Sequence, residues 1–328
     1  MSAPTDPATS QQASLLQHRS FVLYWCARTF TNGAYMMQAV AVGWQIYDLT
    51  GSAFDLGLVG LVQFIPYVPL AIVVGQICGP AIGGLIYAFG PSTVYLTCVA
   101  IFAAAGVLIS LIRLQSPPAE KKPVTLETLF GGFAYLRRQP VLLGAMSLDL
   151  FAVLLGGVTA LLPIFARDIL ETGPWGLGLL RSAPAIGALA ISIVLAHRSM
   201  SRRIGPMLFA AMTAFGLSIV VFALSTSLVL SIAALAIYGA ADAVSVVIRH
   251  SLVQTRTPNE MLGRVMAINS MFTGTSGTLG EFRAGAVAAL FGAFGSVLIG
   301  GVGALVVAAL WMRLFPELAR IDTIEPKR

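Results

Sequence analysis

The chain consists of long apolar stretches separated by short polar segments. The longest stretch, residues 56–112, contains no charged residue and no histidine over 57 positions. As one helix it would extend about 86 Å, whereas the hydrocarbon core of a bilayer is about 30 Å thick. This stretch therefore predicts several crossings joined by very short turns. We expect three spans, at 56–76, 77–90 and 91–112, with the first turn at Gly75 and Gln76.

The other apolar stretches have the length of single membrane helices. They predict spans at 21–44, 141–165, 175–196, 206–224, 228–248, 265–290 and 294–314. Residues 123–139 are different, because they place apolar side chains on one side of a helix, which is typical of a helix in the membrane interface. These side chains are Leu126, Leu129, Phe130, Phe133 and Leu136.

The composition supports a membrane protein. Hydrophobic residues make up 57% of the chain and charged residues only 10%, which is too little charge to cover a soluble protein of 328 residues. Apolar runs of helical length, without ten-residue alternating strands, argue against a membrane β-barrel. The expected fold class is an all-α polytopic membrane protein with about ten transmembrane helices.

The positive charges indicate how the spans are oriented. Lysine and arginine gather at 113–138, 197–205 and 249–264, and cytoplasmic loops are the ones that carry such residues. Both termini are therefore expected in the cytoplasm. We interpret the net charge of +6 as this orientation signal, and expect no nucleic-acid partner. The segment from Thr29 to Ile112 has no lysine or arginine at all, so the turn at Gly75 breaks the pattern.

Charged residues inside apolar stretches are costly in a bilayer and are therefore candidates for function. Six occur in this chain: Arg28, Asp149, Arg181, Asp242, Glu281 and Arg283.

Arg28, Asp149 and Asp242 each lie about 10–12 Å from the inner end of their span, so we expect them to approach one another. A carboxylate beside an arginine can exchange a proton when its partner moves away. The same arrangement can also be a fixed ion pair that only holds helices together.

The other polar candidates have two interpretations each. Arg181 can attract an anionic substrate or hold the adjacent loop, and Gln38 can touch substrate or join helices. Glu281 and Arg283 are two residues apart, face different sides of one helix, and are expected to reach the interface.

No sequence signal for a metal, a cofactor or an enzyme is present. The chain contains no HExxH, GxSxG or Walker sequence, and its three cysteines lie in apolar spans without a CxxC spacing. Gly75, Gly79 and Gly83 recur every four residues, which suits close helix packing or a gate.

Several motifs resemble exporters of the major facilitator superfamily, in the branch that includes bacterial enterobactin exporters and the transmembrane secretion effectors. They are residues 28–33 (RTFTNG), 41–52 (AVGWQIYDLTGS), 161–166 (LLPIFA), 178–184 (GLLRSAP), 257–265 (TPNEMLGRV) and 279–285 (LGEFRAG). The resemblance covers about residues 20–315.

The resemblance implies two helical bundles with a cavity between them, lined by the helices that carry Arg28, Asp149 and Asp242. It divides the chain into a tail at 1–20, an N-terminal bundle at 21–114, a linker at 115–139, a six-helix bundle at 140–315 and a tail at 316–328. Gly79, Pro80, Gly83 and Gly84 are similar to an element of the fifth helix of antiporters. The third and fourth helices of the family are thus expected to be missing near residues 75–77.

The function implied is a monomeric, proton-coupled exporter of a small organic molecule in the bacterial inner membrane, siderophore-like or drug-like. The missing helices leave a second interpretation open, an inactive remnant of such a transporter. An enzyme is the third and least supported class, because no catalytic motif is found.

Overall fold

The structure is a computed structural model that describes residues 30–31, 34–35, 37–38, 41, 45, 73–110, 126–197 and 202–323. Every regular element in these residues is a helix. The all-α class predicted from the sequence is therefore confirmed. Because Arg28 and most of residues 21–72 lie outside the described residues, the predicted spans at 21–44 and 56–76 and the count of ten spans stay predictions.

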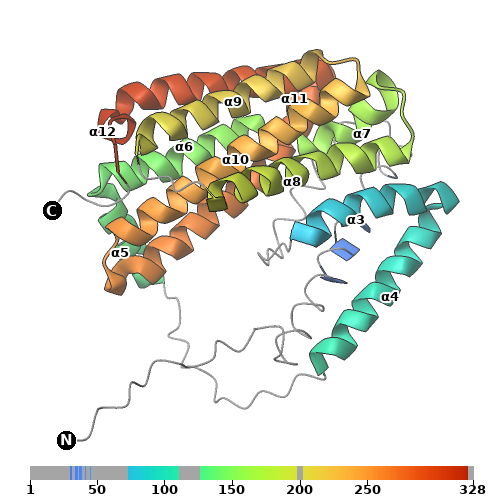
Figure 1. Cartoon of the computed structure of the whole chain (residues 1–328), viewed down its shortest axis with the longest axis horizontal. Coiled ribbons are helices and arrows are strands. Elements are labelled where there is room, and N and C mark those ends of the chain that lie inside the picture. Colours follow the sequence, from blue (N-terminus) through green and yellow to red (C-terminus); the bar gives the residue numbers. More distant parts are fainter. Residues whose placement is uncertain are drawn as a thin grey trace, which may run out of the picture.

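The C-terminal part of the chain forms a bundle of long helices that lie side by side (Figure 1). Within the described residues, five helical segments are long and apolar enough to cross a membrane. The helices of the bundle are α6 (Pro140–Gly156), α8 (Pro174–His197), α9 (Ile204–Leu224), α10 (Leu228–Arg256) and α11 (Asn259–Leu314).

Helix α11 contains two predicted spans joined without a loop. Its backbone leaves the helical conformation at Gly292, where φ is 73° and ψ is 166°. This positive φ suits glycine, which lacks a Cβ. Beyond the kink, the Ser296 hydroxyl donates to the Ala284 carbonyl over 2.7 Å and so joins the two arms.

The span predicted at 141–165 is not one continuous helix. Helix α6 ends at Gly156, and Gly157 is extended, with φ −61° and ψ 100°. Three short turns follow: η3 (Thr159–Leu161), α7 (Leu162–Ile164) and the π-turn η4 (Phe165–Ile169). Two consecutive glycines, followed by Pro163, which has no backbone N–H, account for the break.

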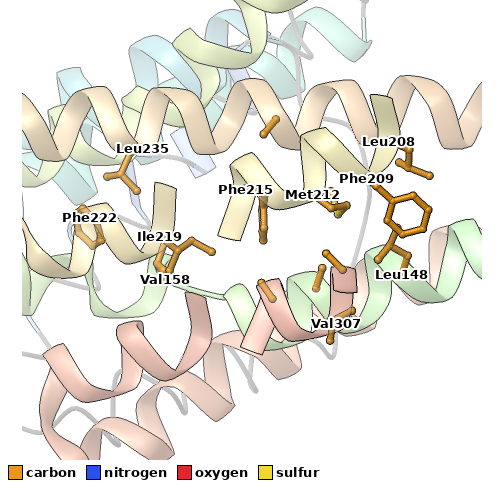
Figure 2. Close-up of a cluster of buried hydrophobic side chains, with 14 of the residues drawn as sticks. Leu148, Val158, Leu208, Phe209, Met212, Phe215, Ile219, Phe222, Leu235 and Val307 are labelled. Carbon is orange, nitrogen blue, oxygen red and sulfur yellow. The ribbon is translucent and has the colours of Figure 1, made fainter. Parts of the chain in front are cut away.

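The core of the bundle lies between α6, α9, α10 and α11 (Figure 2). Phe215 and Ile219 of α9 point into it together with Leu148 of α6 and Val307 of α11, and all four side chains are buried. The Phe215 ring stacks on Tyr238 of α10 with a centroid distance of 4.6 Å. This packing places Tyr238 firmly within the bundle.

Two further helices precede the bundle. Helix α3 (Val73–Ile86) continues through the turn η2 (Tyr87–Phe89), and Gly90, with φ 101°, reverses the chain into α4 (Pro91–Ser110). The turn predicted at Gly75 and Gln76 is wrong, because both residues lie inside α3. The single glycine at that point does not stop the helix, because glycine is common inside membrane helices.

Helix α3 packs on α8, whereas α4 extends away from the bundle (Figure 1). A Cβ added to Gly84 would lie 2.5 Å from the Pro174 carbonyl oxygen and 3.1 Å from the Cα of Gly178. The backbones of α3 and α8 therefore touch, and only glycine allows this approach. Gly83 makes a similar contact with the backbone of Met37, whose Cα would lie 2.8 Å from an added Cβ.

The predicted interfacial helix is confirmed as a helix by α5 (Leu126–Arg137). It buries Leu136 and leaves Phe133 and Arg137 exposed. A Cβ on Gly132 would lie 2.9 Å from Ile268 of α11, so α5 packs against the start of that helix. The short α12 (Pro316–Ala319) ends the described fold.

We expect Gly187→Ala to destabilise the bundle. A Cβ at Gly187 would lie only 1.8 Å from the Ala236 carbonyl oxygen, so α8 and α10 would have to separate. Such overpacking costs about 1–3 kcal/mol. Gly277→Ala is the matched control, because no atom lies within 4 Å of its added Cβ. Thermal unfolding in detergent should show a lower midpoint for the first variant only, and equal midpoints would contradict this packing.

Candidate functional site

A cavity of about 310 Å³ lies between the N-terminal residues and the C-terminal bundle. It is lined by Tyr35, by Pro80 of α3, by the broken segment after α6, and by α8, α10 and α11. Its polar lining consists of Tyr35, Thr159, Arg181, Tyr238, Asp242 and Glu281. The cavity thus combines a mainly apolar wall with a few polar groups, which is the usual composition of a small-molecule site.

Helical spacing explains how α8 and α10 face the cavity. The lining residues of α10 are Leu235, Tyr238, Gly239 and Asp242, which recur at intervals of three and four residues. Residues at this spacing share one face of a helix. Helix α8 has the same spacing, from Arg181 through Pro184 and Ala185 to Ala188.

Three charged side chains of the cavity come from three different helices. Arg181 of α8 and Glu281 of α11 lie close enough for their charges to attract each other. Asp242 lies near the Tyr238 hydroxyl, one turn away on α10. Within the described part of the chain, neither Asp242 nor Glu281 is held by a hydrogen bond or a close ion pair, so both carboxylates are available to a ligand or a proton.

Glu281 was predicted to reach the membrane interface, which stays a prediction, but its place on the cavity wall was not foreseen. Glu281 is half-buried and lines the cavity beside Arg181. The position of Glu281 near the end of a span does not reveal that it faces the cavity, because the side that a residue faces depends on how α11 is rotated about its axis. The sequence signal that could have identified Glu281 as a cavity residue is an acidic side chain at the edge of an apolar run.

The structure does not bring the two predicted aspartates into one site. Asp149 of α6 forms an ion pair with Arg249 of α10, and only 3% and 2% of their side chains are exposed. Arg249 is seven residues beyond Asp242, about 10 Å farther along the same helix. Asp242 lines the cavity, whereas Asp149 belongs to the interior of the bundle.

Arg249 is the buried residue that the sequence placed wrongly. The end of the apolar run near Ile248 suggested a basic loop at 249–264, but α10 continues to Arg256. The Oδ1 atom of Asp149 and the Nε atom of Arg249 have no hydrogen-bond partner among the described residues. The pair therefore has unused hydrogen-bonding capacity in a buried place.

The other residues predicted for the site are Arg28, Gln38 and the glycine-containing element of α3. Arg28 lies outside the described residues, so its expected approach to Asp149 and Asp242 stays a prediction. Gln38 is helical and exposed, and Gly79 and Pro80 are buried. Pro80 lines the cavity, while Gly83 and Gly84 make the close helix contacts described above.

Arg283 supports the wall of the cavity from outside it. Its Nε atom donates to the Leu154 carbonyl over 3.0 Å, and one terminal nitrogen donates to the Leu155 carbonyl over 2.5 Å. The last carbonyls of a helix have no partner within the helix, and a cation at this end is favoured. Arg283 thus caps the broken end of α6, next to the segment that lines the cavity.

The described residues contain no cluster of three or more histidine, cysteine or acidic side chains that could hold a metal ion.

The comparison with known families agrees with this architecture. The sequence profile described as Major Facilitator Superfamily matches residues 67–281. The chain belongs to the major facilitator superfamily. Its matched region runs from α3 through the start of α11 and includes most of the cavity lining.

Enterobactin exporter EntS proteins are relatives of this superfamily member. EntS of Escherichia coli O139:H28 is 27% identical over 263 residues, covering 79% of this chain and 62% of the relative. EntS of Shigella boydii serotype 18 and of Escherichia fergusonii match with the same values. The chain thus spans less than two thirds of the length of these curated relatives.

Solved structures of transporters share the fold. A bacterial homologue of the human lysosomal transporter Spinster, in an inward-facing and unoccupied conformation, has a TM-score of 0.64 and 10% identity, covering 92% of this chain and 98% of that one. The nucleoside transporter NupG has a TM-score of 0.56 and 12% identity, covering 88% of this chain and 90% of that one. At these identities, the likeness concerns the fold alone.

We expect Asp149→Asn to destabilise the bundle strongly. Removing one partner of a buried ion pair leaves an uncompensated charge, which costs about 3–5 kcal/mol. Replacing both residues, Asp149→Leu with Arg249→Met, should recover most of this loss, since apolar side chains of similar volume avoid the desolvation cost. Thermal unfolding of both variants in detergent tests this, and a double variant less stable than the single one would disprove it.

We also expect Arg283→Met to weaken the end of α6. The variant leaves the Leu154 and Leu155 carbonyls without their donor, at roughly 1–3 kcal/mol for each buried group left unpaired. Ser296→Ala is the control, because it removes a neighbouring hydrogen bond of α11 without touching α6. Hydrogen exchange measured by mass spectrometry should rise over residues 154–165 in the first variant only. Unchanged exchange there would contradict the capping role.

Proposed function

We propose that this chain is a secondary transporter that exports a small organic molecule in exchange for protons. The observation that carries the proposal is the cavity in which Asp242, Glu281 and Arg181 meet from three helices. The cavity faces N-terminal residues on one side and the C-terminal bundle on the other. This is where a two-bundle transporter holds its substrate, at the interface of its repeats.

The carboxylates supply the proton chemistry in this proposal. Each can bind a proton while the cavity opens to one side of the membrane and release it on the other. Arg181 favours the ionised form of Glu281, whereas loss of water around the pair disfavours it. Proton binding is thereby linked to movement of the N-terminal part of the chain against the bundle, which changes the surroundings of the cavity.

Membership in the superfamily and the similarity to enterobactin exporters support export of a siderophore-like or drug-like molecule. We propose that the chain is a monomer in the bacterial inner membrane. Its lysine and arginine distribution supports a cytoplasmic position for both termini. The close backbone contact of Gly84 with α8 gives the two bundles a surface on which to rock.

A second candidate, an inactive remnant, follows from the gap that the sequence resemblance implies. The chain covers 62% of the EntS length, and α4 exposes large apolar side chains such as Leu96, at 70%, and Val99, at 64%. These side chains face lipid in a working transporter, or they face the place of the third and fourth helices of the superfamily in a remnant. The sequence resemblance puts that gap near residues 75–77.

Transport in proteoliposomes tests the leading proposal. Vesicles containing the purified chain receive a mixed panel of siderophores and amphipathic drugs, and mass spectrometry measures what accumulates when a pH gradient is imposed. We expect accumulation that collapses with the gradient and that Asp242→Asn or Glu281→Gln abolishes. Gly277→Ala, whose added Cβ meets no atom within 4 Å, should transport normally. Gradient-independent accumulation would refute proton coupling.

The same assay separates the two candidates. A version of the chain with two helices restored from a relative near residues 75–77 is compared with the chain itself. Equal transport by both supports a working transporter, whereas transport by the restored version alone shows that the chain is a remnant.

A further inference from the structure

The distribution of charge in the cavity carries information about the substrate. The described lining contains two carboxylates and one guanidinium. The one guanidinium, Arg181, can balance only one of the two carboxylates. Asp242 forms no close ion pair with a described residue, so the described lining carries one more acidic than basic side chain.

The aromatic residues of the lining also favour a positively charged ligand. Tyr238 lies one turn before Asp242, and Tyr35 faces the cavity from the N-terminal side. One face of the Tyr238 ring is stacked on Phe215, which fixes the ring in place. Aromatic rings beside a carboxylate form the usual environment for an ammonium group, because the ring face is negative. A carboxylate alone would bind any hydrogen-bond donor.

We infer that the substrate is a cation, an ammonium group on an apolar body, which binds with its charge against Asp242 and its body against the apolar wall. This inference rests on the proposed function and names its substrate class. The wall beyond Asp242 is formed by side chains such as Leu162, Ala188 and Leu235. These side chains can pack against the apolar body of a ligand. They provide neither a hydrogen-bond donor nor a positive charge to bind an anion.

The proposed exchange of substrate for protons gives a second reason for a cation. A cation binds the ionised Asp242 and therefore competes with a proton, which is the condition for moving the two in opposite directions. An anion would bind Arg181 best when Glu281 is protonated, so it would travel together with protons. The titratable or charged groups that line the cavity together with Asp242 are Tyr35, Arg181, Tyr238 and Glu281. Among them, Arg181 is the one permanent cation, and Glu281 lies beside it.

Binding to the purified chain in detergent tests the inference without requiring transport. The probes are phenylpropyl-trimethylammonium, phenylpropyl-sulfonate as the anion of similar size, and the neutral analogue in which a tert-butyl group replaces trimethylammonium. We expect isothermal titration calorimetry to show binding of the cation only. Its affinity should fall as the pH is lowered, and binding should release protons to the buffer.

Two variants locate the effect. Asp242→Asn should lower the affinity for the cation by roughly tenfold or more, as expected for loss of one charge-assisted contact. Asp242→Glu keeps the carboxylate and should retain binding, which separates loss of charge from misfolding. Equal binding of the cation and its neutral analogue by the unmodified chain would overturn the inference, and so would stronger binding of the sulfonate. Either result would leave proton-coupled transport of another substrate class intact, as measured in proteoliposomes.

Discussion

The structure depends on one constraint, that hydrocarbon offers no water to satisfy a polar group, so each must find its partner within the protein. Arg283 shows how this works, because the break of α6 frees two carbonyls and the guanidinium of α11 binds both. The break would otherwise be prohibitively costly at membrane depth. It is this supported break that lets Val158, Thr159 and Leu162 line the cavity.

Close backbone contact is the second means by which the fold is held together. Helices in lipid gain little from hydrophobic burial, so they associate through packing, which small residues bring close. Gly187 against Ala236 and Gly239 against the Pro184 carbonyl join α8 to α10 in this way. Since Arg181 and Asp242 lie on these same two helices, the glycine contacts also set the separation of the charged groups across the cavity.

The spans of the C-terminal bundle could be predicted from the sequence, because the length of an apolar run directly measures a membrane crossing. The break at Gly157 was missed, although Gly156, Gly157 and Pro163 were visible signals for it. The partners of the charges could not be predicted, since a span of given length can rotate about its own axis without changing its hydropathy. Asp149 was therefore matched with Arg28 by depth, and its partner Arg249 was assigned to a loop.

The buried charged residues form two groups, Asp149 with Arg249 and Asp242 with Glu281. The groups have different surroundings, which indicate different roles. Asp149 and Arg249 lie wholly within the C-terminal bundle, where movement of that bundle as a rigid body leaves their separation unchanged. Asp242 and Glu281 instead face Tyr35 and Pro80, which belong to the N-terminal part of the chain. Any movement of one part against the other changes the polarity and the water around these two carboxylates. The fixed-pair interpretation therefore suits Asp149, and the proton-exchange interpretation suits Asp242, although the sequence assigned both residues to one site.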